Sequence, residues 1–193
     1  MKTAMRKYEF TEEAKTLCDG TVLHRIRALI DIDLGWRIVK AGELGGWLEK
    51  ETNLSHFGQC WVYGNAEVLG DARIYGDAEV WGKARVYDYA KIFGNAEVYH
   101  NAKVFGYAKI GGNAIVWGNA EVCGDAKVCG RAMVCGNAEV YGDAKVCGRA
   151  MVCGDTEVYG DTKIGGDEIV RGINHIADDA FGSWIMNRFT KQE

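Results

Sequence analysis

The chain has 193 residues, a hydrophobic fraction of 48%, a charged fraction of 26% and a formal net charge of −4. This length and balance are typical of one folded domain and exclude a disordered chain, and the small net charge disfavours nucleic acid or an anionic membrane as a general partner. The chain contains 26 glycines and no proline, which favours a regular, turn-rich repeat over a flexible linker. Because no apolar run could span a bilayer and residues 1–10 lack the core of a signal peptide, we expect a cytoplasmic protein without a membrane partner.

The first fifty residues do not repeat, and we expect them to form a β-rich capping module. From Thr21 to Asp33 apolar and polar residues alternate with a period of two, as in a half-buried strand. Asp19-Gly20, just before this segment, is a strong hairpin signal, so residues 7–17 are the predicted partner strand. His24 falls on the apolar side of the strand, where a packing role is favoured over a ligand role.

From residue 58 to residue 171 the chain repeats in units of six without an insertion. Gly and then Asn or Asp opens most units, a small residue, usually Ala, holds the third place, and Val or Ile holds the fifth. Third and fifth places lie two apart, so their side chains point the same way in a short strand, while the opening pair suits a corner with positive φ. Three strands then close a coil of eighteen residues, and residues 124–141 recur almost unchanged at 142–159. The predicted fold class is all-β, a parallel β-helix shaped as a triangular prism with stacked valines inside.

These units resemble the hexapeptide repeats of left-handed parallel β-helix proteins, a superfamily that includes many acyltransferases and the γ-type carbonic anhydrases. The resemblance implies a left-handed coil. Residues 25–29, 41–47 and 53–56 further resemble the leading module of uncharacterised hexapeptide-repeat proteins from phages and prophages. We therefore divide the chain into an N-terminal β-hairpin cap at 1–50, a β-helix at 51–171 and a tail at 172–193.

The tail is predicted to form a C-terminal helix that caps the array or mediates oligomerisation. Phe181, Trp184 and Ile185 share one face at helical spacing. Asp178 and Asp179 precede them, as the helix dipole favours.

Outward residues recur every eighteen positions, so each face of the prism carries a column of like residues. The apolar column predicts an oligomer interface together with Phe181, Trp184 and Ile185, and its members are Ile115, Trp117, Met133, Met151 and Ile169. The basic and acidic columns are candidate binding residues for a second subunit or a host protein; they are Arg73, Lys91, Lys109, Lys127, Lys145 and Lys163, and Glu121, Glu139 and Glu157. Nucleic acid is the less favoured partner of the basic column, because aspartates two residues earlier partly neutralise it.

The sequence offers few groups for catalysis or metal binding. Six of the seven cysteines fall in the repeat without CxxC spacing, so we expect free thiols and no metal. His56, His100 and His175 do not share one site on the eighteen-residue wheel, which disfavours the zinc site of a γ-type carbonic anhydrase. Neither His100 nor His175 has an acidic partner at an expected spacing, so no catalytic residue is assigned.

Two functions remain open at this level. The favoured one is a non-catalytic scaffold without a cofactor, phage- or prophage-derived, that assembles with itself and binds a host protein, for example to inhibit a bacterial defence system such as a CRISPR nuclease. The alternative is an acetyltransferase that binds acetyl-CoA at a subunit interface, with His100 as its candidate base.

Overall fold

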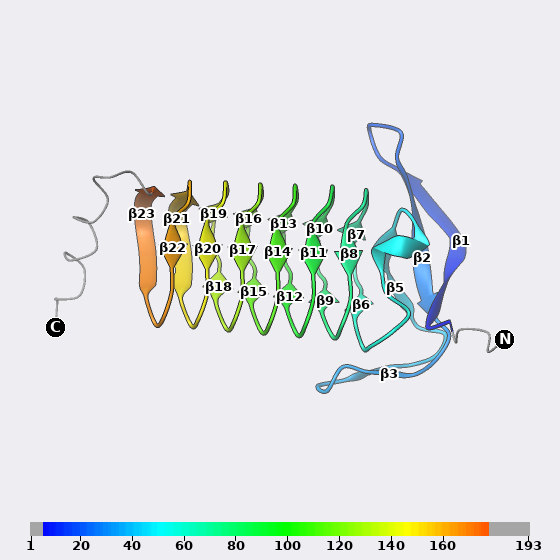
Figure 1. Cartoon of the computed structure of the whole chain (residues 1–193). Coiled ribbons are helices and arrows are strands. Elements are labelled where there is room, and N and C mark those ends of the chain that lie inside the picture. The colour runs from blue at the N-terminus through cyan, green and yellow to red at the C-terminus, as the bar shows by residue number, and fades with distance from the viewer. Residues whose placement is uncertain (1–5, 178–193) are drawn as a thin grey trace.

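The computed structural model describes residues 6–177, and a parallel β-solenoid forms its centre. Figure 1 shows the coils stacked along one axis, with the N-terminal strands gathered at one end. Residues eighteen apart are register partners on neighbouring coils, such as Lys127 with Lys145 and Glu121 with Glu139. The predicted all-β parallel β-helix is therefore confirmed, whereas its left-handed sense stays a prediction.

Three faces, each named after residues in its outward column, make up the solenoid. The methionine face carries β6 (Trp61–Val62), β9 (Glu79–Val80), β12 (Glu97–Val98), β15 (Ile115–Val116), β18 (Met133–Val134) and the first part of β21 (Met151–Tyr159). The glutamate face carries β7 (Glu67–Val68), β10 (Arg85–Val86), β13 (Lys103–Val104), β16 (Glu121–Val122), β19 (Glu139–Val140) and the last part of β21. The lysine face carries β8 (Arg73–Ile74), β11 (Lys91–Ile92), β14 (Lys109–Ile110), β17 (Lys127–Val128), β20 (Lys145–Val146) and β22 (Lys163–Ile164).

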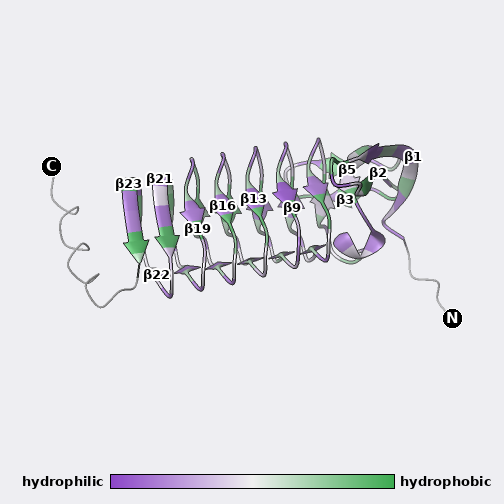
Figure 2. Cartoon of the chain, turned by 90° about the horizontal axis from the view of Figure 1, so that it is seen from above, coloured by the Kyte–Doolittle hydropathy of each residue, from purple (hydrophilic) through white to green (hydrophobic). Residues whose placement is uncertain are grey.

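The core consists of the small and branched residues that the repeat places third and fifth in each unit. Every fifth-place Val or Ile from Val62 to Ile164 is buried, and the alanines between them are fully buried. In Figure 2 purple and green alternate along the coils, because a polar outward residue precedes the inward valine or isoleucine on the glutamate and lysine faces. Burial of one such side chain stabilises the fold by about 1.5–3 kcal/mol, so the stacked core is the main source of stability.

Glycines form the corners, as predicted. Gly130, for example, has φ +74°, and a Cβ there would lie 2.7 Å from the carbonyl oxygen of Gly148 on the next coil. The corners therefore need glycine both for its backbone conformation and for the close approach of successive coils. Asp88 and His100 occupy two corners with φ 58° and 59°, a conformation that costs other residues about 1–2 kcal/mol.

The N-terminal module contains the predicted hairpin. Its strands β1 (Tyr8–Thr16) and β2 (Val22–Ala28) pair antiparallel. Strand β5 (Leu44–Leu48) pairs with β2 on one side and with β7 on the other, which joins the module to the glutamate face. The predicted strand over 21–33 ends early, at Ala28, because the Asp31 carboxylate accepts hydrogen bonds from Lys40 and Ala41 and turns the chain into a second hairpin of β3 (Ile32–Asp33) and β4 (Ile38–Val39).

The first coil of the solenoid has carbonyl groups that no preceding coil can satisfy. Lys7 Nζ donates to the carbonyl oxygens of Cys60, at 2.7 Å, and Gly58, at 3.2 Å, and its side chain is only 2% exposed. The Tyr8 hydroxyl likewise donates to the carbonyl oxygen of Leu54, just beyond the short 3₁₀ helix η1 (Glu51–Asn53). Burial lowers the pKa of Lys7. These two side chains cap the open edge.

The far end of the described solenoid is β23 (Ile169–Ala177), which pairs with β21 along its whole length. Residues 172–177, which we assigned to the tail, thus continue the parallel array as a strand. The predicted C-terminal helix, with Phe181, Trp184 and Ile185, lies outside the described residues.

Candidate functional site

The acidic column of the glutamate face lies in register from coil to coil, as predicted. Lys103 pairs with Glu121, Glu121 with Glu139, and Glu139 with Glu157, while β23 adds His175 as the next member. Lys103 Nζ lies 2.6 Å from Glu121 Oε1. Glu139 is exposed and makes no ion pair within residues 6–177.

Glu157 and His175 form the most chemically capable pair of side chains on the outer surface. His175 Nδ1 lies 3.1 Å from Glu157 Oε2, and the histidine side chain is 61% exposed. The Tyr141 hydroxyl donates to the same carboxylate oxygen at 3.3 Å. Burial and the neighbouring Glu157 carboxylate raise the pKa of Tyr141, so this hydroxyl stays a donor at neutral pH. A carboxylate at Nδ1 orients the imidazole and leaves Nε2 as the nitrogen that can accept a proton.

The expectation that His175 lacks an acidic partner is wrong. Ile173 and Asn174 depart from the six-residue phrase, but the eighteen-residue register continues through β23 and places His175 beside Glu157. The signal was present in the sequence, because His175 follows Glu157 by one full coil. No acidic side chain pairs with the His100 ring anywhere in residues 6–177.

His100 occupies a corner between the methionine and glutamate faces. Its imidazole packs against Tyr99, Trp81 and Trp117, with ring centroids 4.9, 6.0 and 6.2 Å away. The residue also lines an open depression of about 420 Å³, together with Gly82, Lys83, Asn101, Gly118 and Asn119. The histidine is accessible there, but within the described part of the chain nothing charged orients it.

An aromatic stack lies beside this corner. Tyr63, Trp81, Tyr99 and Trp117 follow one another at successive coils, and Trp81 stacks on Tyr99 with centroids 4.2 Å apart. Trp36, from the β3–β4 hairpin, donates to the nearly buried Glu79 carboxylate, which also accepts a hydrogen bond from Tyr63. Burial raises the pKa of Glu79, and these two hydrogen bonds partly oppose that shift. The eighteen-residue spacing of the rings predicts the stack, whereas sequence reasoning missed the contact of Trp36 with Glu79, which has no signature in the repeat.

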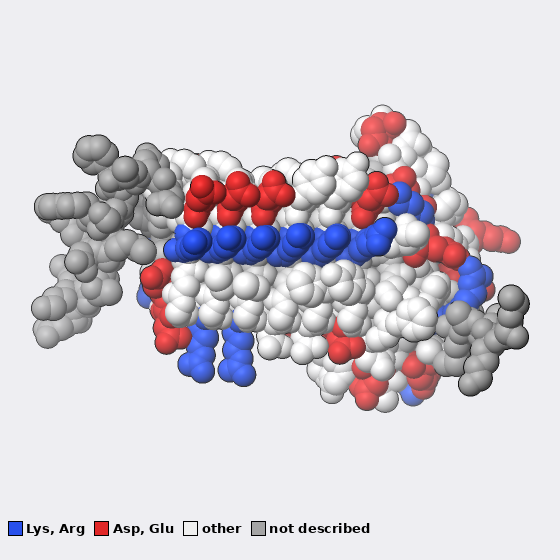
Figure 3. Space-filling model, viewed as in Figure 1, with Lys and Arg blue, Asp and Glu red and all other residues white. Residues whose placement is uncertain are grey.

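The basic column lies on the lysine face in unbroken register, from Arg73 through Lys91, Lys109, Lys127 and Lys145 to Lys163. Figure 3 shows it as a continuous blue row with acidic groups beside part of it. Within residues 6–177 no member of this column forms an ion pair with those neighbours. The row is a linear array of cations, and its binding role stays a prediction.

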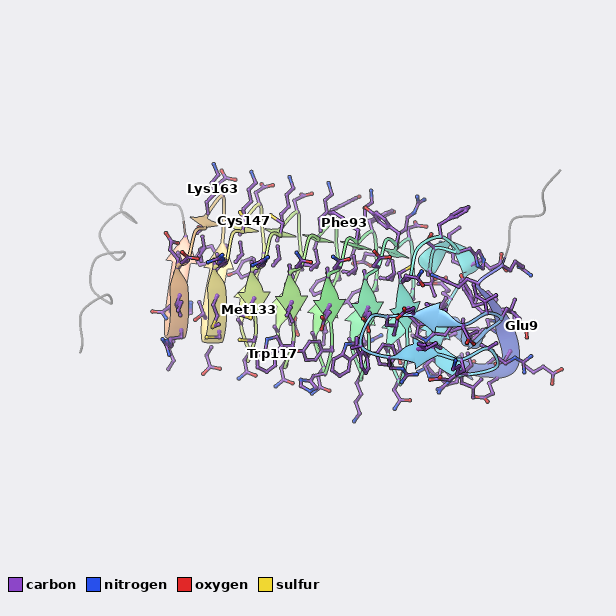
Figure 4. All side chains as sticks on the ribbon, turned by 90° about the horizontal axis from the view of Figure 1, so that it is seen from below. Glu9, Phe93, Trp117, Met133, Cys147 and Lys163 are labelled. Atoms are coloured by element: carbon purple, nitrogen blue, oxygen red, sulfur yellow. The ribbon has the colours of Figure 1, made fainter. Side chains whose placement is uncertain are left out.

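The apolar column lies on the methionine face, where Ile115, Met133 and Met151 are in register and half-buried. Ile169 continues it on β23 and is 53% exposed. Figure 4 shows Met133 and Trp117 near each other on the side seen from below, with Lys163 at the opposite edge. The structure thus brings Ile115, Trp117, Met133, Met151 and Ile169 together, and their use as an oligomer interface stays a prediction.

The described residues hold no group of three or more His, Cys, Asp or Glu side chains that could bind a metal ion. All seven cysteines are free thiols. Cys135 is buried, and this burial and the neighbouring Cys153 raise its pKa to about 11. Among residues 6–177 no helix has the length and apolar character needed to cross a membrane.

Comparison with known proteins adds one partial relative, and no family model matches the chain. The chain is 39% identical over 74 residues to a protein of Escherichia coli (strain K12) named uncharacterized acetyltransferase YdcK. The match covers 34% of this chain and 22% of the relative. The chain therefore spans about a fifth of the length of that relative. Its repeat and its solenoid fit the hexapeptide-repeat superfamily.

This match corrects the function that we favoured from the sequence. The expectation of a non-catalytic scaffold for a host protein is wrong, because the matching relative carries an acetyltransferase name. It rested on the uninterrupted repeat and on the resemblance of the leading module to phage proteins. The Glu157–His175 pair now provides a histidine with an acidic neighbour. Similarity to phage proteins is not part of the match.

Proposed function

We propose that this chain is an acetyltransferase of the hexapeptide-repeat superfamily that uses acetyl-CoA and takes His175 as its general base. The Glu157–His175 contact of 3.1 Å on the exposed glutamate face carries the proposal. The partial match to an acetyltransferase-named protein supports the reaction class. The acceptor is a nucleophile with a removable proton, an amine or a hydroxyl.

The proton transfer follows from the geometry of the pair. Acetyl-CoA supplies an activated acetyl group whose thioester carbonyl carbon can be attacked. His175 Nε2 takes the proton from the acceptor nitrogen or oxygen as that atom bonds to the carbonyl carbon, and the C–S bond then breaks to release the CoA thiolate, which takes up a proton. Glu157 holds Nδ1 in its protonated form and stabilises the imidazolium that forms between the two steps. Tyr141 fixes the carboxylate through its hydroxyl.

The neighbouring lysine face suits the charged part of the donor. Lys163 follows Glu157 on the same coil, and Lys145 lies in register with it one coil earlier. Ammonium groups in a row are suited to the phosphate groups of CoA. We propose that these two lysines contribute to holding the donor while His175 acts on the acceptor.

Self-association is part of the proposal, since the apolar column of the methionine face is a suitable surface for a second copy. Sedimentation of the full chain tests it, with Met133→Lys as the variant expected to shift the oligomer towards monomer.

Calorimetry with acetyl-CoA and the full chain tests the proposed function. We expect saturable binding in the micromolar range that weakens at least about threefold in Lys163→Ala, because one charge-assisted contact to a phosphate is lost. Glu12→Gln changes an exposed carboxylate of β1, in the N-terminal module, and should bind acetyl-CoA like the original chain. Absence of saturable binding to the original chain would overturn the proposal.

His100 is the second candidate for the base. It is favoured by the open depression of about 420 Å³ at its corner. It lacks the oriented carboxylate that His175 has, so His100→Gln should keep most of the acetyl transfer.

A further inference from the structure

An aromatic column on the glutamate face is interrupted at one coil. Tyr87 stacks on Phe105 with centroids 4.8 Å apart and planes 2° apart, and Tyr141 stacks on Tyr159 at 5.4 Å and 9°. Cys123 holds the position between Phe105 and Tyr141, since successive coils pair Lys103 with Glu121 and Glu121 with Glu139. One coil of this column therefore carries a thiol where its neighbours carry a ring.

The interruption leaves space for a single flat group. Two strand spacings of ~4.8 Å place the rings of Phe105 and Tyr141 about 9.6 Å apart. A planar group midway between them would lie about 4.8 Å from each ring, which is within the distance of about 6 Å over which a cation is attracted to an aromatic face. Cys123 itself is half-buried at the floor of this position and extends only one sulfur beyond its Cβ.

The charges around the interruption favour a cation. Lys103 already pairs with Glu121, and the exposed Glu139 has no ionic partner in the described chain. Burial raises the pKa of Cys123, and the nearby Glu121 and Glu139 carboxylates raise it further, so both carboxylates act at this position. The surplus of negative charge disfavours a neutral or anionic ring.

The glutamate face already has a guanidinium group that contacts both an aromatic ring and a glutamate. The Arg85 guanidinium carbon lies 5.7 Å from the centroid of the Tyr87 ring. Arg85 Nε also lies 2.9 Å from Glu67 Oε2, on the preceding coil. Arg85 thus makes, two coils from Cys123, the same two kinds of contact that a guanidinium over Cys123 would make.

We propose that the position over Cys123 binds the guanidinium group of an arginine in a peptide partner, stacked between Phe105 and Tyr141 and paired with Glu139. Arginine is favoured over lysine because its guanidinium is planar, stacks on aromatic faces and donates in two directions. The site lies three coils, or about 14 Å, from His175. It shares Tyr141 with the proposed catalytic pair, but its peptide-binding test does not depend on acetyl transfer.

An NMR titration of the full chain with a capped Gly-Arg-Gly peptide tests this proposal. We expect saturable binding, and about tenfold weaker binding of the matched lysine peptide and of the citrulline peptide, which keeps the planar shape without the charge. Equal binding of the three peptides, or no saturable binding of the arginine peptide, would overturn the proposal.

Three variants locate the site. Cys123→Tyr completes the aromatic column and should weaken binding of the arginine peptide at least about tenfold, while Cys147→Tyr, in the equivalent place on the lysine face, should leave it unchanged. Glu139→Gln alters only an exposed carboxylate and should weaken binding about threefold even if the tyrosine variant fails to fold. Unchanged binding in Glu139→Gln would contradict the proposal, as would equal losses in the two tyrosine variants.

Discussion

His175 Nδ1 lies 3.1 Å from Glu157 Oε2, and the two residues are register partners on adjacent coils. The contact arises because β23 continues the parallel array for one strand beyond the regular repeat. The Glu157 carboxylate also accepts a hydrogen bond from the Tyr141 hydroxyl, which holds it beside the imidazole.

Glu157 is predicted to act as a positioning residue. Glu157→Gln should lower kcat for acetyl transfer about tenfold or more with little change in KM, because the imidazolium loses its charged partner after substrate binding. Steady-state kinetics at several acceptor concentrations measures the split. Glu12→Gln serves as the control, and a Glu157→Gln variant that changes only KM or the melting temperature would contradict this role.

Glycine is predicted to be required at the corners for two reasons that add. Gly130→Ala should lower the free energy of unfolding by at least about 2 kcal/mol, since its Cβ would lie 2.7 Å from Gly148 O and φ is +74°. Urea unfolding followed by circular dichroism measures the loss. Gly165→Ala is the matched control, because nothing lies within 4 Å of a Cβ there; similar losses in both variants would be inconsistent with this explanation.

His100 is predicted to be strained at its corner. His100→Gly should be more stable than His100→Ala by about 1 kcal/mol, because both variants lose the imidazole and only alanine keeps the unfavourable φ of 59°. Thermal unfolding of the two variants gives the difference directly. Equal stability would mean that the corner relaxes without cost.

Glu97 is predicted to make stability depend on pH. Burial raises the pKa of this carboxyl, so ionisation is more costly in the folded than in the unfolded chain. The resulting loss of folding stability is absent below pH 4.5, the ordinary pKa of the group. It grows as pH rises through the raised pKa of the folded state and is complete above that pKa. Glu97→Gln should therefore raise the melting temperature at pH 7 and not at pH 4; an equal rise at both pH values would refute the assignment.

The sequence was sufficient to predict the residues that repeat. Lys127 beside Lys145, Glu139 beside Glu157 and Met133 beside Met151 all follow from the eighteen-residue period, because a coil without insertions keeps every outward position in one column. Corner glycines follow from the same period. Phe181, Trp184 and Ile185 lie outside the described residues, so their predicted helix remains a prediction.

Contacts beyond the regular repeat follow from the eighteen-residue spacing only if the coil continues, and contacts outside the repeat do not follow from it. Glu157 meets His175 only because β23 preserves the register after Ile173 and Asn174 depart from the phrase. Trp36 reaches Glu79 through a hairpin whose direction depends on the turn at Asp31, and no period links residues 43 positions apart. Tertiary packing of non-repeating segments decides these contacts.

Release of the CoA thiol from acetyl-CoA, measured with the full chain and a panel of amine and hydroxyl acceptors, is the most direct test of acetyl transfer at the Glu157–His175 pair. We predict acceptor-dependent thiol release that falls at least about 100-fold in His175→Gln, with an unchanged melting temperature, and that persists in Glu12→Gln. Thiol release no faster than in buffer with every acceptor, or an undiminished rate in His175→Gln, would contradict it.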